Sequence, residues 1–114
     1  MITLEQLKEF GADTDKGLAM CMGNEALYLR LVSSVPGEAR FDDLTKALET
    51  KDLDAAFEAA HALKGVLGNL SLTPLLTSCV TITELLRNRT DTDYSGYLAE
   101  LTEKQKELSK LCEN

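Results

Sequence analysis

The chain has 114 residues, of which 44% are hydrophobic and 27% charged, a composition typical of one globular domain. Its formal net charge is -7, with 12 basic residues scattered among 19 acidic ones. DNA, RNA and anionic membranes are therefore poor candidate partners, and another protein is the better expectation. The sequence has no apolar run long enough to span a membrane and no signal-peptide core near its start, so we expect a cytoplasmic protein.

Short helices are predicted at the start of the chain. Thr3 and Gln6 match a capping box, and Gly11 is a suitable stop for the helix that they begin. The segment 12–24 is less regular and is a candidate for a second short helix. Asn24 can cap a third helix, and the Pro-Gly pair that follows Val35 is expected to break or bend the chain.

Four longer helices are predicted after this break, because apolar residues recur at helical spacing in each. Asp52 is the expected N-cap of the second helix, Thr73 of the third and Asp93 of the fourth, with proline following Thr73 at the first helical position. The apolar stripes of the third and fourth helices are Leu75, Cys79, Ile82 and Leu86, then Tyr94, Tyr97, Leu98, Leu101, Leu108 and Leu111. Since the connections are short, we expect an all-α fold: an antiparallel up-and-down four-helix bundle with short additional N-terminal helices. Residues 1–114 would form a single domain.

The helix expected over residues 53–70 carries the one histidine of the chain, His61. On a helical wheel of about 100° per residue, one continuous arc is apolar and must face the core. This arc comprises Leu53, Ala56, Ala59, Ala60, Leu63, Val66, Leu67 and Leu70. His61 lies on the opposite arc, which it shares with Asp54, Phe57, Glu58, Lys64, Gly65 and Gly68. We therefore predict that His61 is exposed to solvent.

Two glycines lie on the same arc as His61, although glycine costs about 1 kcal/mol relative to alanine inside a helix. The apolar spacing continues through both Gly65 and Gly68, so we interpret them as clearance for a partner's surface; for Gly68, helix termination remains an alternative. Lys64 lies one turn from the imidazole and can offer an ammonium group to an anion. Phe57 and Glu58 are further candidate contacts of a partner, with Phe57 expected to be exposed.

Several kinds of site are excluded by the residues themselves. Glu58 and His61 form one Glu-x-x-His pair, but a di-iron bundle needs two such pairs. The three cysteines lack the spacing of zinc ligands, and we expect them to be reduced thiols that behave as small hydrophobes. A nucleophilic Cys-His pair has no supporting motif. No phosphate-binding loop or kinase signature is present, so a phosphoryl group on His61 would have to come from another protein.

The segment His61-Ala62-Leu63-Lys64-Gly65, followed by Gly68-Asn69-Leu70, resembles the signature of histidine-containing phosphotransfer (HPt) domains. These domains typically show His-x-Leu-Lys-Gly and then a stretch of small residues that ends in Asn-Leu-Gly or similar. The resemblance extends upstream to GNEALYLRL and ALETKD, and downstream to Leu75, Cys79 and Ile82. Ser71 stands where the family usually has glycine, and Thr83 where it often has glutamate.

The resemblance implies a role in a phosphorelay. His61 would accept a phosphoryl group from a receiver-domain aspartate and pass it to another receiver, with Lys64 stabilising the charge of the phosphate. The protein would be a stoichiometric phosphocarrier and not an enzyme, without a cofactor of its own, and Mg²⁺ would be supplied by the receiver. The implied partners are a response regulator receiver domain and a hybrid histidine kinase, with the protein itself a monomer. The alternative function is that of a helical adaptor that docks on a receiver or kinase without carrying phosphate.

Overall fold

The computed structural model describes residues 2–113, and within this range every regular element is a helix. The elements are α1 (Leu4–Phe10), α2 (Thr14–Met20), α3 (Glu25–Ser34), the 3-10 turn η1 (Val35–Gly37), α4 (Ala39–Glu49), α5 (Leu53–Asn69), α6 (Thr73–Arg87) and α7 (Ser95–Cys112). The all-α class predicted from the sequence is confirmed. None of the helices in residues 2–113 combines the length and apolar character needed to cross a membrane.

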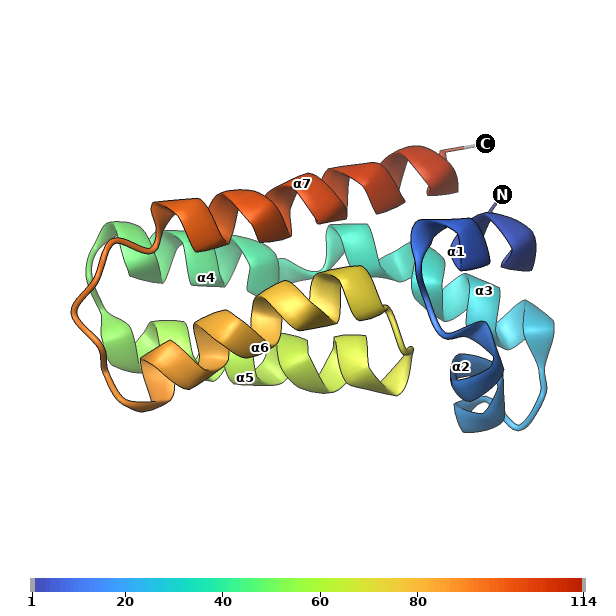
Figure 1. Ribbon diagram of the computed structural model, residues 1–114, viewed down its shortest axis with the longest axis horizontal. Helices are drawn as coiled ribbons and strands as arrows, with labels where there is room; N and C mark the ends of the chain where they lie inside the picture. Colours follow the sequence, from blue (N-terminus) through green and yellow to red (C-terminus); the bar gives the residue numbers. More distant parts are fainter. Residues whose placement is uncertain (1, 114) are drawn as a thin grey trace.

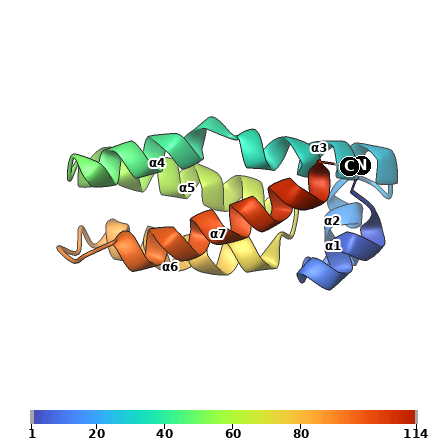
Figure 2. The same cartoon turned by 90° about the horizontal axis from the view of Figure 1, so that it is seen from above.

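The four longer helices lie side by side along the long axis of the molecule, and the chain reverses direction at each connection between them (Figure 1). Within this group, α4 packs against α5, α5 against α6, and α6 against α7. Beyond the break at η1, α3 continues the line of α4, as the view from above shows (Figure 2). The short helices α1 and α2 lie beside α3 at this end of the molecule, next to the connection between α5 and α6.

Most of the predicted helix boundaries are confirmed by local hydrogen bonds. The backbone N–H of Gln6 donates to the Thr3 hydroxyl at 3.1 Å, and the Gln6 side chain accepts from the Thr3 N–H at 3.0 Å, which is a complete capping box. Gly11 ends α1 in the left-handed conformation, with φ of 111°. The Asn24 side chain caps α3, and the Asp52 carboxylate caps α5 by accepting from Ala55 N–H at 3.1 Å.

The predicted N-cap of α6 is wrong by one position. Thr73 is the first residue of the helix and Leu72 is its N-cap, so no side chain caps this end. The reason lies in the preceding turn, where Ser71 adopts a left-handed φ of 53° and sends the chain directly into α6. Leu72 is fully buried in the core, and its burial takes the place of a capping hydrogen bond in fixing the start of the helix.

The start of α7 also differs from the prediction. The N-cap is Tyr94, which makes no side-chain capping bond, while Asp93 lies one residue earlier. The Asp93 carboxylate still accepts from the first helical N–H, that of Ser95, at 2.9 Å, so its chemistry was predicted correctly and its position was not. Tyr97 was expected in the apolar stripe but remains 37% exposed, because the inward side of α7 is filled by leucines such as Leu101 and Leu108.

The predicted inward arc of α5 packs into the core. Ala56, Ala59, Ala60, Leu63 and Leu67 are buried along the helix, and Leu70 is buried just after it. Leu53 and Val66 are only partly buried. The three alanines allow α4 and α6 to approach α5 closely from either side, since they present only a methyl group. This packing fixes which face of α5 remains in solvent, and that face carries His61.

Candidate functional site

The candidate site is built on the exposed face of α5, which is a continuous helix through both glycines. His61 and Gly65 are exposed, as the wheel predicts, and Gly68 is partly covered. A Cβ atom added at Gly65 would meet no atom within 4 Å, and one added at Gly68 would meet only Leu76 Cδ1 at 3.9 Å, an ordinary van der Waals distance. Internal packing therefore requires neither glycine.

The end of α5 is formed by Ser71 and not by Gly68. The N–H of Ser71 donates to the Gly68 carbonyl at 3.1 Å, and the N–H of Leu72 donates to the Leu67 carbonyl at 3.0 Å. With Ser71 left-handed at φ of 53°, these two bonds make a Schellman motif. Gly68 is thus an ordinary residue of the last helical turn. The left-handed residue is Ser71, at the position where HPt domains usually have glycine.

Lys64 lies one turn beyond His61 and is partly buried. None of the ion pairs formed within residues 2–113 uses its ammonium group. Its charge is close enough to α6 to act on Cys79: burial raises the pKa of that thiol, while a hydrogen bond with Thr83 and the charge of Lys64 oppose the rise. No carboxylate within residues 2–113 forms an ion pair with Lys64.

Phe57 is not an exposed side chain, contrary to the prediction. It is partly buried and stacks on the His61 ring, with 5.6 Å between the ring centroids and 21° between the planes. The guanidinium carbons of Arg87 and Arg89 lie 5.3 Å and 4.9 Å from the centroid of the Phe57 ring, within the range of cation–π contacts. A helical wheel of α5 could not identify either arginine, because Arg87 is the last residue of α6 and Arg89 lies in the connection that follows it.

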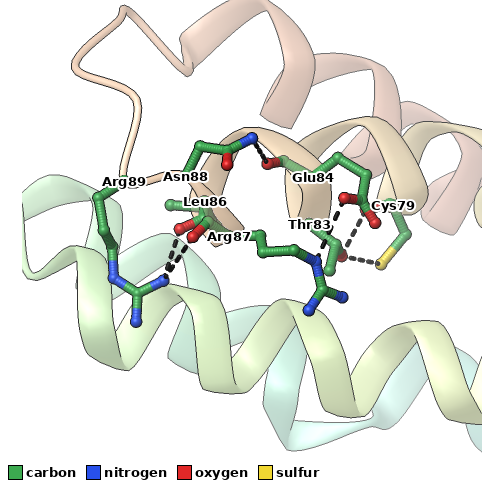
Figure 3. A network of polar contacts seen from close by, with 7 residues as sticks. All are labelled: Cys79, Thr83, Glu84, Leu86, Arg87, Asn88 and Arg89. Atoms are coloured by element: carbon green, nitrogen blue, oxygen red, sulfur yellow. Dashed lines mark hydrogen bonds and ion pairs between the residues drawn. The ribbon is translucent and has the colours of Figure 1, made fainter.

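The two arginines are held by further contacts. Arg89 Nε donates to Asp54 Oδ1 at 2.7 Å, which ties the end of α6 to the first turn of α5, and its Nη1 donates to the Leu86 carbonyl at 2.6 Å. Arg87 Nε pairs with Glu84 Oε2 at 3.2 Å. Figure 3 shows the Arg87 side chain at the end of α6 and the Arg89 side chain on the connection that follows, both extending towards α5.

Glu58 lies apart from the other candidate residues. It is exposed and borders a groove between α4 and α5 that is also lined by Arg40, Asp43 and Lys46. The neighbours described above place Phe57 and Gly68 on the α6 side of His61. Lys64 follows Phe57 by seven residues, or two helical turns, and so shares this side of the helix, whereas Glu58 lies at the opposite edge. Within residues 2–113, no cluster of three or more His, Cys, Asp or Glu side chains could hold a metal ion.

A small polar network lies beneath the site, inside the core. The Thr83 hydroxyl donates to the Cys79 carbonyl at 2.7 Å (Figure 3). The Cys79 thiol donates to the carbonyl of Ala60, one residue before His61, at 3.4 Å. Thr83 is fully buried, so the side chain that departs from the family pattern does not reach the exposed face.

A comparison with known protein families identifies the domain to which this face of α5 belongs. The model of the Hpt domain matches residues 37–113, which include every candidate residue named above. The chain belongs to the Hpt domain family. Membership of the Hpt family implies a part in histidine phosphotransfer within a phosphorelay. Neither the curated proteins nor the solved structures provide a match to the chain.

The Hpt match leaves α1, α2 and α3 outside, yet these helices are joined to the end of the histidine-bearing helix. The Tyr28 hydroxyl donates to the Leu70 carbonyl at 2.8 Å, and Asp13 N–H donates to the Ser71 carbonyl at 3.0 Å. Burial raises the pKa of Tyr28 to about 12, which keeps the hydroxyl protonated and able to donate. The N-terminal helices thereby bind the turn that ends α5 in this Hpt domain.

Proposed function

We propose that the protein is a stoichiometric histidine phosphocarrier of a phosphorelay. His61 accepts a phosphoryl group from the aspartyl phosphate of one receiver domain and passes it to the aspartate of another. The observation that carries the proposal is the exposed imidazole one turn from Gly65, whose surroundings are open, on a helix of an Hpt domain. In this proposal residues 1–114 act as one domain, in which α4 to α7 form an antiparallel up-and-down four-helix bundle that displays His61.

The transfer step needs only groups that the two proteins supply. A ring nitrogen of neutral His61 attacks the phosphorus with its lone pair, the bond from phosphorus to the aspartyl oxygen breaks, and the electron pair leaves with the carboxylate. The other ring nitrogen keeps its proton. Charge is spread over the equatorial phosphoryl oxygens during transfer, so the ammonium group of Lys64 stabilises it. Mg²⁺ comes with the receiver, and the protein has no cofactor of its own.

Docking of the receiver uses the face around the imidazole. Gly65 and Gly68 leave room for the rim of the receiver's active site, while Phe57 and Glu58 lie where that rim would end. The partners in this proposal are a receiver domain and a hybrid histidine kinase. They bind a monomer in the cytoplasm, with no role for nucleic acid or membrane.

A panel of phosphorylated receivers tests the proposal. The wild-type protein should acquire acid-labile phosphate from at least one receiver, and His61→Gln should acquire none while keeping the helical circular dichroism spectrum. Glu100→Gln, an exposed change in α7, is the control and should be labelled like the wild type. Labelling of His61→Gln equal to that of the wild type would refute the assignment, as would absence of labelling from every receiver of the source organism.

A further inference from the structure

The ring of Phe57 is the centre of a cluster that the transfer chemistry does not yet use. Three groups lie within 6 Å of its centroid: the imidazole of His61 at 5.6 Å and the guanidinium carbons of Arg87 and Arg89 at 5.3 Å and 4.9 Å. We call Phe57, Arg87 and Arg89 the ring platform. It joins the first half of α5 to the end of α6 directly beside the imidazole.

An exposed histidine needs such support if it is to react in one geometry. Rotation about the bond between the ring and Cβ is soft, so a free imidazole samples many orientations. Transfer requires one ring nitrogen to point in line with the phosphorus and the leaving oxygen, and fixing that geometry before the reaction lowers the barrier. Phe57 precedes His61 by one helical turn, so the two rings share a face and can stack.

Each arginine contacts the Phe57 ring and also pairs with a carboxylate. Each already has a carboxylate partner: Asp54 lies 2.7 Å from Arg89 Nε, and Glu84 lies 3.2 Å from Arg87 Nε. These pairs neutralise much of the positive charge on the platform, whereas Lys64 has no ion pair within residues 2–113. Their contacts with Phe57 therefore serve to fill its α6 side and restrict its motion.

We propose that Phe57, held in place by Arg87 and Arg89, is a positioning residue that orients the His61 imidazole for phosphoryl transfer. This inference rests on the proposed function. Phe57 would then affect the rate of the chemical step and not the affinity for the receiver. Arg87 and Arg89 would contribute to the site by holding Phe57 in place.

The test measures transfer from a phosphorylated receiver at saturating concentration, together with the receiver's Kd. Phe57→Leu keeps an apolar side chain but removes the stacked ring, and we expect the saturated rate to fall about three- to tenfold, the range that the strength of an aromatic pair implies. The Kd should stay within about twofold, since docking contacts remain. Phe57→Tyr should recover most of the rate, and Arg89→Gln should slow it less than Phe57→Leu does.

A second measurement needs no phosphate. Loss of the Phe57 ring current in Phe57→Leu should shift the imidazole C–H resonances of His61 in the NMR spectrum, whereas Phe10→Leu in α1 should leave them and the rate unchanged. The inference would be overturned if Phe57→Leu transferred phosphate at the wild-type saturated rate, or if slower transfer came only from a higher receiver Kd. Unshifted imidazole resonances in Phe57→Leu would also overturn it. If instead the wild type takes no phosphate at His61, the proposed function fails, and the NMR result still reports on the stack.

Discussion

Replacing Gly65 by alanine should make the protein more stable. Gly65 lies inside the continuous helix α5, and a Cβ atom there would meet no atom within 4 Å, so the substitution has no steric cost. The gain in helix propensity is about 0.8–1 kcal/mol. With an unfolding entropy of about 2.1 cal/mol/K per residue, this gain raises the Tm of a chain of this length by about 4 °C.

A larger side chain at the same position should impair the function that the glycine serves. Gly65→Gln also improves helix propensity, but its side chain would stand on the face beside His61 that the receiver approaches. We expect weaker receiver binding and slower phosphoryl acceptance together with a Tm above that of the wild type. Thermal unfolding followed by circular dichroism gives the stability, and titration with a receiver gives the Kd.

Gly96 provides the matched control, because it is a helical glycine of α7 whose surroundings are also open. Gly96→Gln should leave receiver binding and phosphoryl acceptance unchanged. The clearance argument is wrong if Gly65→Gln binds the receiver as tightly as the wild type and accepts phosphate as fast. If the Tm of Gly65→Ala were below that of the wild type, glycine at this position would be required for the stability of α5 itself.

Three further predictions concern the charge beside His61 and the end of α5. Lys64→Ala should slow phosphoryl acceptance about tenfold, equivalent to about 1.4 kcal/mol of transition-state stabilisation, with unchanged circular dichroism. An unaltered rate would show that the ammonium group does not stabilise the transition state. Because burial raises the pKa of Tyr28 to about 12, the folded state favours the neutral phenol; the contribution of Tyr28 to stability should be constant below about pH 10 and fall as the pH rises towards 12. Tyr28→Phe should make the alkaline loss of stability in urea titrations smaller than in the wild type, and should cost about 1 kcal/mol at neutral pH, since the Leu70 carbonyl loses its donor; an unchanged alkaline profile would contradict the assignment. Ser71→Gly should raise the free energy of unfolding by about 1 kcal/mol relative to Ser71→Ala, because the residue has a left-handed φ of 53°; equal stability of the two variants would refute this reason.

Features governed by neighbouring residues in the chain were predictable from the sequence. The capping box of Thr3 and Gln6 and the caps at Asn24 and Asp52 depend on side chains that reach only three residues along the backbone. The buried arc of α5 was predictable as well, since a long helix with a strong apolar periodicity has only one face to bury. The exposure of His61 follows from that arc.

Features governed by contacts between distant segments were not predictable in the same way. Phe57 was placed on the exposed arc, but its ring is covered by Arg87, the last residue of α6, and by Arg89 in the connection that follows, and no wheel of α5 contains them. The start of α6 was misplaced because burial of Leu72 and the left-handed turn at Ser71 replaced the expected Thr73 cap. In both cases packing between elements outweighed the local pattern.

The central claim is that His61 carries the phosphoryl group, and mapping the modified residue tests it most directly. The protein is incubated with a phosphorylated receiver, kept at neutral to alkaline pH, digested and analysed by tandem mass spectrometry. We predict one phosphoryl group, located on His61, lost on mild acid treatment and discharged when a second receiver is added. Phosphate found on another residue, or a protein that stays unmodified while the receiver is consumed by water, would contradict the account.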